Sequence, residues 1–189
     1  MRLGVLALQG DFAAHAKAFA RAGAPVVEVR TPEALAEVDA LAIPGGESTT
    51  MLKFLDREGL WDPLLAFAAR GGAFLGTCAG AILLAKSVTN PEQRSLGVVD
   101  ISVRRNAYGR QIDSFIASGP APALGPELLE MVFIRAPQIE NVGPAATAVV
   151  EYLGKPVLVE QGRHLVATFH PELTSDDRIH RRFLANLKK

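Results

Sequence analysis

Short apolar runs alternate with helical patterns through the first half of the chain, and this alternation constrains the fold more than any other feature. The apolar runs, each of strand length, are residues 2–8, 24–30, 40–46 and 72–78. The intervening and following segments predict helices over 11–22, from Thr31, from an N-cap at about Ser48, over 60–70 and from Ala79 to Lys86. Continuously apolar strands joined by helices indicate a parallel sheet that is covered on both faces. We therefore predict an α/β fold.

The second half of the chain has a different pattern, in which β-rich runs follow one another with short links. These runs are residues 113–117, 131–137, 146–153, 155–161 and 164–170. Gly154 and Gly162 mark two of the links as hairpin turns. A final helix is predicted over 175–188. The whole chain, 1–189, is expected to form one domain: a three-layer α/β sandwich whose mainly parallel central sheet carries an added antiparallel portion.

Composition excludes several classes of function. The 20 basic and 20 acidic residues give a formal net charge of zero, so nothing favours nucleic acid or an anionic membrane as a partner. No apolar stretch approaches the roughly 18 residues that a membrane-spanning helix needs, and the first apolar run is too short for a signal peptide. A single cysteine excludes an internal disulfide and any site built from several thiolates. It suits a reducing compartment, so we expect a cytoplasmic protein.

That cysteine, Cys78, lies between Gly76 and Gly80, at the end of a predicted strand and the start of a predicted helix. The pattern matches the nucleophile elbow, G-x-S-x-G, with Cys in place of Ser, because small neighbours permit the sharp turn. The helix start would favour a thiolate, and the N–H of Ala79 would serve as an oxyanion donor. The alternative is an ordinary buried cysteine. The two glycines between a strand and a helix favour the nucleophile.

A thiol nucleophile needs a base, and the chain has four histidines. His15 and His180 lie within predicted helices and are expected at the surface, and His164 follows a turn and is expected in solvent. His170 ends an apolar strand, and Glu172, two positions on, would point to the same side of an extended segment. That carboxylate would orient the imidazole. The alternative is a capping Glu with an incidental His.

The segment 43–50, IPGGESTT, places Gly45 and Gly46 between a predicted strand and a predicted helix. Such a loop exposes backbone N–H groups to an anion. It lacks the Lys of a phosphate-binding P-loop, so a second oxyanion donor for the Cys78 site is the better interpretation. A tight turn with Ser48 as the helix cap is the alternative, and the two are compatible.

Together these stretches resemble the class I (triad) glutamine amidotransferases, which have a flavodoxin-like fold. In that family a Cys on a G-x-C-x-G elbow attacks the side-chain amide of glutamine. The resemblance implies that Cys78 is the nucleophile, that His170 is the acid and base, and that Glu172 orients it. The enzyme would be a glutaminase.

A narrower resemblance covers nearly the whole chain. Six segments are similar, in the same order, to the glutaminase subunits of pyridoxal 5′-phosphate synthases: residues 4–11, 43–51, 76–86, 104–115, 133–137 and 169–173. The segments 109–115 and 133–137 distinguish this family from the histidine- and purine-pathway relatives. Ile43 stands where the family is expected to have Leu.

The narrower resemblance implies that the chain hydrolyses L-glutamine to L-glutamate and ammonia. The ammonia would pass to a separate (β/α)₈ barrel subunit that makes pyridoxal 5′-phosphate, in vitamin B6 biosynthesis, and that activates the glutaminase. No cofactor and no metal are implied. The oxyanion hole would be formed by Gly46 and Ala79. Glutamine would be bound by Gly46, Glu47, Ser48, Arg105, Ile134 and Arg135.

Chemistry supports part of this assignment, since glutamine carries both an α-carboxylate and an α-ammonium group. The guanidinium of Arg105 would bind the carboxylate with a fork of donors. Gln9 ends the first strand, where we expect it to position the oxyanion loop or to meet a partner. The alternatives are a glutaminase subunit of another amidotransferase complex, a Cys-elbow hydrolase of related fold, and a non-catalytic regulatory subunit.

Overall fold

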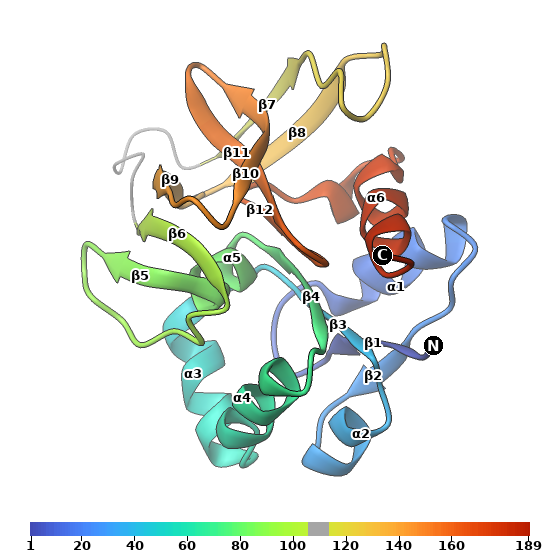
Figure 1. Ribbon diagram of the computed structural model, residues 1–189, viewed down its shortest axis with the longest axis vertical. Helices are drawn as coiled ribbons and strands as arrows, with labels where there is room; N and C mark the ends of the chain where they lie inside the picture. Colours follow the sequence, from blue (N-terminus) through green and yellow to red (C-terminus); the bar gives the residue numbers. More distant parts are fainter. Residues whose placement is uncertain (106–113) are drawn as a thin grey trace.

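The computed structural model describes residues 1–105 and 114–189, which form an α/β molecule around one large sheet (Figure 1). Within these residues the large sheet has seven strands. From one edge to the other they are β10 (Thr147–Tyr152), β11 (Lys155–Gln161), β12 (His164–Ala167), β4 (Ala73–Thr77), β3 (Ala40–Ile43), β1 (Leu3–Leu6) and β2 (Val27–Val29). The strands from β12 to β2 run parallel, and β11 is antiparallel to both of its neighbours, β10 and β12. The predicted parallel core and antiparallel addition are confirmed, as are both hairpins.

The helices follow the predicted segments closely. They are α1 (Phe12–Arg21), α2 (Pro32–Ala36), α3 (Ser48–Arg57), α4 (Trp61–Ala69), α5 (Ala79–Leu84) and α6 (Arg178–Asn186), with a 3₁₀ turn η1 (Pro171–Leu173) before α6. Helix α3 begins at the predicted residue, but its cap is Glu47 and not Ser48. The longer Glu47 side chain reaches the N–H groups of both Thr49 and Thr50, at 3.2 and 2.7 Å.

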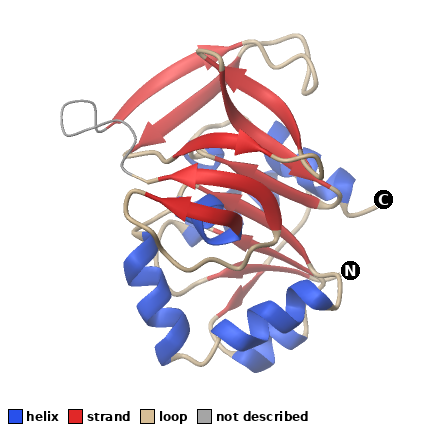
Figure 2. Cartoon of the chain, turned by 60° about the vertical axis from the view of Figure 1, so that its left-hand side comes forward, coloured by secondary structure: helices blue, strands red, loops and turns tan. Residues whose placement is uncertain are grey.

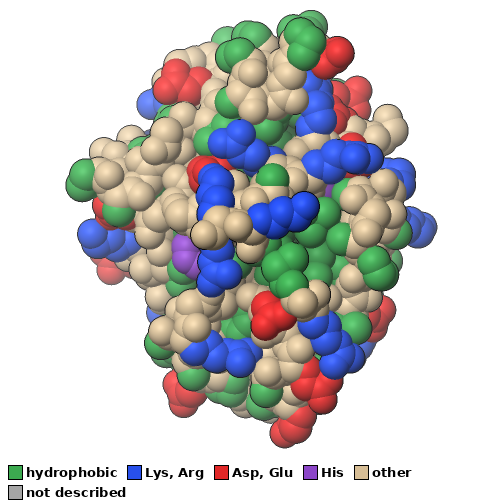
Figure 3. All heavy atoms as spheres, turned by 45° about the vertical axis from the view of Figure 1, so that its right-hand side comes forward, with side chains coloured by type: hydrophobic (Ala, Val, Ile, Leu, Met, Phe, Trp, Pro, Cys, Tyr) green, Lys and Arg blue, Asp and Glu red, His purple; other side chains and the backbone are tan. Residues whose placement is uncertain are grey.

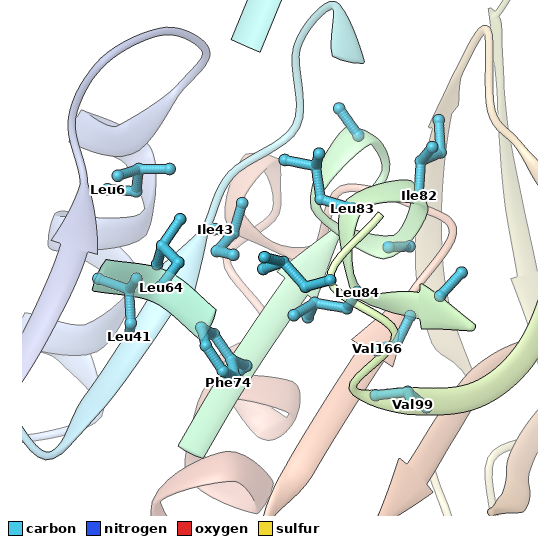
Figure 4. Packing of buried hydrophobic residues seen from close by; sticks show 14 of the residues in the cluster. Leu6, Leu41, Ile43, Leu64, Phe74, Ile82, Leu83, Leu84, Val99 and Val166 are labelled. Atoms are coloured by element: carbon cyan, nitrogen blue, oxygen red, sulfur yellow. The ribbon is translucent and has the colours of Figure 1, made fainter. Parts of the chain in front are cut away.

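Two hydrophobic clusters cover the two faces of the sheet. Alternate residues of a strand enter opposite clusters, so that Leu41 and Ile43 pack on one side and Ala40 and Ala42 on the other. Figure 4 shows the first cluster, in which strand residues pack against helices α2, α3, α4 and α5. The second cluster packs the sheet against α1 and α6. The predicted covering of both faces is therefore present.

Two smaller sheets extend the molecule. One contains β5 (Ala85–Thr89), β6 (Val99–Arg104) and β9 (Gln138–Val142), and the other is a hairpin of β7 (Ser114–Gly119) and β8 (Leu129–Ile134). Figure 2 shows the β7–β8 hairpin at the top of the molecule, away from α3 and α4. Strands β5, β6 and β9 were not predicted. The helix expected from Ala79 to Lys86 ends at Leu84, because Ala85 turns to extended backbone and begins β5.

The carboxyl ends of β1, β3, β4 and β12 meet at one edge of the sheet, since these strands are parallel neighbours. The chain goes from β1 outward to β2 and then returns to place β3 on the other side of β1. Open α/β sheets bind their ligands in the crevice that such a reversal creates. The segments that follow these strands contain Gln9, Gly45, Cys78 and His170. Most of the predicted family segment 109–115 lies outside the described residues.

In the described part of the chain, no helix has both the length and the apolar character needed to cross a membrane. Figure 3 shows one face of the molecule, on which side chains of both charges are present and Lys and Arg gather near the middle.

Candidate active site

Cys78 occupies a sharp turn between β4 and α5, with φ 48° and ψ −102°. Such a conformation is rare for a residue other than glycine and is typical of functional sites. The glycines explain how the turn fits: a Cβ at Gly80 would lie 2.2 Å from the carbonyl oxygen of Ile43, and one at Gly76 would lie 2.8 Å from the carbonyl of Gly80. The N–H of Cys78 donates to the carbonyl oxygen of Ala167 at 2.9 Å. The backbone of a nucleophile elbow is therefore present.

His170 follows β12 and Glu172 lies in the turn η1, and the two side chains are paired. The distance from His170 Nδ1 to Glu172 Oε1 is 2.8 Å, and both residues are buried. Gly45 lies against both His170 and Cys78, since a Cβ there would lie 2.2 Å from His170 Cε1 and 3.2 Å from Cys78 Cβ. The structure thus brings together the three residues that the sequence pattern singled out.

The surroundings of His170 favour its protonated form. Burial by itself would lower the pKa of the imidazole, but hydrogen bonds to Cys78 and Glu172 and the charges of both groups outweigh it and raise the pKa to about 10. The pKa of Glu172 is lowered below its usual value: burial opposes this, but the electrostatic attraction of His15 and the hydrogen bond from His170 outweigh it. At neutral pH the pair is therefore an imidazolium beside a carboxylate.

The expectation that His15 and His180 lie at the surface is wrong, because neither is exposed at all. His15 shares the inner face of α1 with Ala18 and Phe19, three and four positions on, and a helical periodicity would have revealed this. His180 lies on the inner face of α6 in the same way. His164 is half-buried and not solvated, and its Nδ1 accepts a hydrogen bond from the N–H of Phe74 at 3.2 Å.

A pocket of about 350 Å³ opens in front of Cys78 and His170 at the carboxyl edge of the sheet. It is lined by most of the residues predicted to bind or activate the substrate: Gly46, Glu47, Ser48, Cys78, Arg105, Ile134, Arg135 and His170. Ala79 and Glu172 do not line it, since they are buried directly behind Cys78 and His170. Five lining residues were missed: Gly10, Asp11, Ile82, Pro137 and Leu173. Ile82 lies one helical turn beyond Cys78, so its position was available from the sequence.

The Gly45–Gly46 loop contacts the residue that ends the first strand. The N–H of Glu47 donates to Gln9 Oε1 at 3.1 Å, and a Cβ at Gly46 would lie 2.5 Å from the same oxygen. Gly46 has a φ of +145°, a conformation that L side chains rarely adopt. The side chain of Gln9 therefore packs against the loop predicted to form the oxyanion hole.

Comparison with known proteins identifies the family. Residues 5–189 match the SNO glutamine amidotransferase family. The chain belongs to this family. It is 56% identical to a Solibacter usitatus protein named pyridoxal 5′-phosphate synthase subunit PdxT, over 98% of this chain and 99% of that protein. It is 52% identical to the Deinococcus radiodurans protein of the same name, over 97% of this chain and 96% of that one.

Solved structures agree with this assignment. A crystal structure described as a glutamine amidotransferase superposes on this amidotransferase with a TM-score of 0.91, at 44% identity and over the full length of both chains. The structure of PurLQS from Thermotoga maritima has a TM-score of 0.72 at only 14% identity, with 98% of each chain covered. That more distant likeness shows the fold alone, and it matches the predicted class I amidotransferase fold.

The charged side chains of the amidotransferase pocket differ in their hydrogen-bond partners. Burial would raise the pKa of Glu47, but hydrogen bonds from the hydroxyls and N–H groups of Thr49 and Thr50 outweigh it and lower the pKa to about 2. Arg105 Nη2 lies 3.8 Å from Glu47 Oε1. Arg135, with φ 42°, turns sharply at the end of β8. The Glu47 carboxylate is therefore held by its own helix, and Arg105 and Arg135 line the same pocket.

Among the described residues, no group of three or more His, Cys, Asp or Glu side chains is arranged to hold a metal ion. The side chains that meet at this site are a thiol, an imidazole and a carboxylate.

Proposed function

We propose that this chain is the glutaminase subunit of a pyridoxal 5′-phosphate synthase, which hydrolyses L-glutamine to L-glutamate and ammonia. The relatives at about half identity over nearly their full length carry the name of that subunit, which supports the choice of complex. One observation carries the reaction: Cys78 on its turn and His170 paired with Glu172 line one pocket in a member of a glutamine amidotransferase family.

The reaction begins when the Cys78 thiolate attacks Cδ of the glutamine amide and forms a C–S bond. The oxyanion accepts hydrogen bonds from the N–H groups of Gly46 and Ala79. His170, protonated at neutral pH because its pKa is raised to about 10, gives its proton to the nitrogen as the C–N bond breaks. Ammonia leaves, and a γ-glutamyl thioester remains.

Water then completes the cycle. Neutral His170 takes a proton from the water as its oxygen attacks the thioester carbonyl. Glutamate is released, and the thiolate and imidazolium are restored. Glu172 does not react: its carboxylate keeps Nδ1 of His170 occupied, so that Nε2 is the nitrogen that exchanges protons with the substrate.

Glutamine binding follows from the pocket charges. Arg105 and Arg135 bind the α-carboxylate, and the segment Gly46, Glu47 and Ser48 binds the rest of the amino acid. The carbonyl oxygen of Ile134, which lies 3.8 Å from Cys78 Sγ, faces the reacting end of the pocket. A volume of about 350 Å³ is large enough for a free amino acid.

Ammonia is delivered to the synthase subunit of the complex, a (β/α)₈ barrel that docks on the glutaminase and activates it. Free ammonia would be protonated in solution and would lose its nucleophilicity, which is a physical reason to couple the two sites. The single cysteine suits the reducing cytoplasm, where we propose that the complex works.

A glutaminase assay with and without the synthase subunit of the same organism tests the proposal. We expect glutamate release to be slow for the isolated chain and much faster in the mixture, and the Cys78→Ala variant to be inactive in both. If the chain hydrolysed ester substrates but released no glutamate from glutamine, that result would instead support a Cys-elbow hydrolase. Glutaminase activity that the synthase subunit leaves unchanged would support another amidotransferase complex.

A further inference from the structure

Behind the pair of His170 and Glu172, the structure buries two more histidines that the proposed reaction does not use. We propose that His15 is a positioning residue that holds the outer oxygen of Glu172, and that His180 holds His15 in the tautomer this requires. The proposal rests on the glutaminase function proposed above, but its tests are separable from that function.

The contacts form a continuous chain from the pocket to helix α6. Glu172 Oε1 is paired with His170 Nδ1, while Oε2, which has no hydrogen bond within the described residues, lies 3.4 Å from His15 Nε2. The same His15 nitrogen lies 3.0 Å from Thr77 Oγ1. His15 Nδ1 lies 3.1 Å from His180 Nε2. Each member comes from a different element: η1, α1, β4 and α6.

Only one arrangement of protons is consistent with these distances. If His15 Nε2 lacked a proton, its lone pair would face the buried, negatively charged Oε2 of Glu172 and repel it. His15 Nδ1–H would then donate to His180, whose buried Nδ1–H would have no acceptor among the described residues. With the proton on Nε2, His15 donates towards Glu172 and Thr77, and its Nδ1 accepts from His180 Nε2–H.

Both inner histidines are neutral in this arrangement. Burial lowers the pKa of His15, and the attraction of Glu172 offsets this only in part. Burial, and then electrostatic repulsion by His15, lower the pKa of His180 to about 3. The other charged groups that act on the two rings are His170 and Asp11 for His15, and Glu172, Arg21 and Asp177 for His180. His15 therefore offers Glu172 an N–H without a positive charge.

This neutrality matters for the reaction. A charged group behind Glu172 would compete with the His170 imidazolium for the same carboxylate and make His170 a stronger acid. A neutral N–H donor fixes the carboxylate without that competition. Without it, the buried, negatively charged Oε2 would lose the N–H group that lies 3.4 Å away, and Glu172 would turn away or take up a proton. In either case the hold on His170 Nδ1–H weakens.

Nitrogen NMR on protein with labelled histidines tests the tautomers directly, because the chain has only four histidines to assign. We expect neutral His15 and His180, each protonated on Nε2, from pH 7 to pH 9. A His15 with bare Nε2, or with a positive charge near neutral pH, would overturn the proposal. This measurement needs neither glutamine turnover nor a variant that folds.

The variant His15→Phe keeps the ring volume and removes both nitrogens. We expect kcat of the complex to fall by roughly 10-fold or more, as when a hydrogen-bond partner of a functional residue is lost, with KM for glutamine changing far less. The alkaline limb of the pH profile, which follows loss of the His170 proton, should move down by about one pH unit, a tenfold change in proton affinity. His15→Gln restores an N–H near the place of Nε2 and should recover part of both effects.

His164→Phe is the matched control, since it removes a half-buried imidazole at the opposite end of β12. It should lower the melting temperature but leave the pH profile unchanged. A folded His15→Phe variant with wild-type kcat and an unmoved alkaline limb would overturn the proposal. A wild-type complex that releases no ammonia would instead refute the proposed function, while NMR of the His170 proton would still report on His15.

Discussion

Replacing Gly45 by alanine tests whether the contact between His170 and Cys78 is the working geometry. The backbone at Gly45 is not in the left-handed region, so its conformation is one that alanine can adopt. The new Cβ, however, would lie 2.2 Å from Cε1 and 2.9 Å from Nδ1 of His170. Ordinary contact begins at 3.4 Å, so the imidazole must move by about 1 Å or the loop must open by as much.

The imidazole has little freedom to make that movement harmlessly. Its Nδ1 is fixed by Glu172 at 2.8 Å, and the backbone N–H of His170 donates to the carbonyl oxygen of Val132 at 2.8 Å. The displacement therefore changes the distance to Cys78 and to the leaving nitrogen. A misplacement of about 1 Å costs roughly 100-fold in rate, so we expect kcat of the Gly45→Ala complex to fall by about that factor.

The assay compares kcat and KM for glutamine in complexes of wild type and variant with the synthase subunit. Gly119→Ala is a matched control: Gly119 also has ordinary φ, and its nearest neighbour is the flexible tip of Met131 at 3.3 Å. The control should turn over as wild type does. A Gly45→Ala complex with wild-type kcat would refute the reasoning, because His170 could not then act from the position described.

Three further predictions address the site and its charges. Cys78→Ala should abolish glutamine hydrolysis and His170→Asn should reduce it by roughly 10⁴-fold, measured as glutamate release by the complex; retained activity in Cys78→Ala would remove the proposed mechanism. Arg105→Ala should raise KM for glutamine and change kcat little, so steady-state kinetics with a large fall in kcat at constant KM would contradict its binding role. His180 has a pKa of about 3 in the folded protein, compared with 6.5 in the unfolded chain. As the pH falls from 6.5 towards 3, the unfolded chain protonates this histidine before the folded protein does, so the free energy of unfolding decreases over that pH range. Denaturant unfolding at pH 7 and pH 4 should show this loss, and a slope unchanged in His180→Phe would disprove the assignment to His180.

The parallel core could be predicted because its strands are buried on both faces and its helices carry clear start signals. Runs such as 40–46 and 72–78 are largely apolar and contain no charged residue, a pattern that indicates cover on both sides. The turn at Cys78 could be predicted because Gly76 and Gly80 leave room that no other residue type leaves. In these cases the local sequence and the tertiary structure demand the same residues.

The unpredicted strands depend on contacts that are remote in sequence. β6 pairs with β5 on one side and with β9, more than 30 residues later, on the other. β5 begins directly after α5, and nothing in the run of Ala and Leu before it distinguishes the end of a helix from its continuation. Strands of such a small sheet take their conformation from their partners more than from their own propensity.

The two inner histidines were misplaced for a related reason. A histidine in a helix is more often at the surface than buried, so residue type alone favoured the wrong position for both. The decisive information is pairwise: His15 and His180 lie 165 positions apart, and each is a suitable neighbour for the other only once α1 and α6 pack side by side. The helical periodicity around His15 gave the one local signal, through Ala18 and Phe19.

Backbone pairing, more than side-chain packing, sets the distance between the nucleophile and the base. The β4–β12 ladder ends with Thr77 opposite Ala167, and the hydrogen bond from the N–H of Cys78 to Ala167 continues it by one residue. His170 is then tied to β8 through Val132. β8 also carries Ile134, whose carbonyl oxygen faces Cys78 Sγ. The base and one wall of the pocket therefore depend on the β7–β8 hairpin, which lies outside the parallel core. The antiparallel additions, which the sequence pattern separates from that core, are for this reason part of the active site.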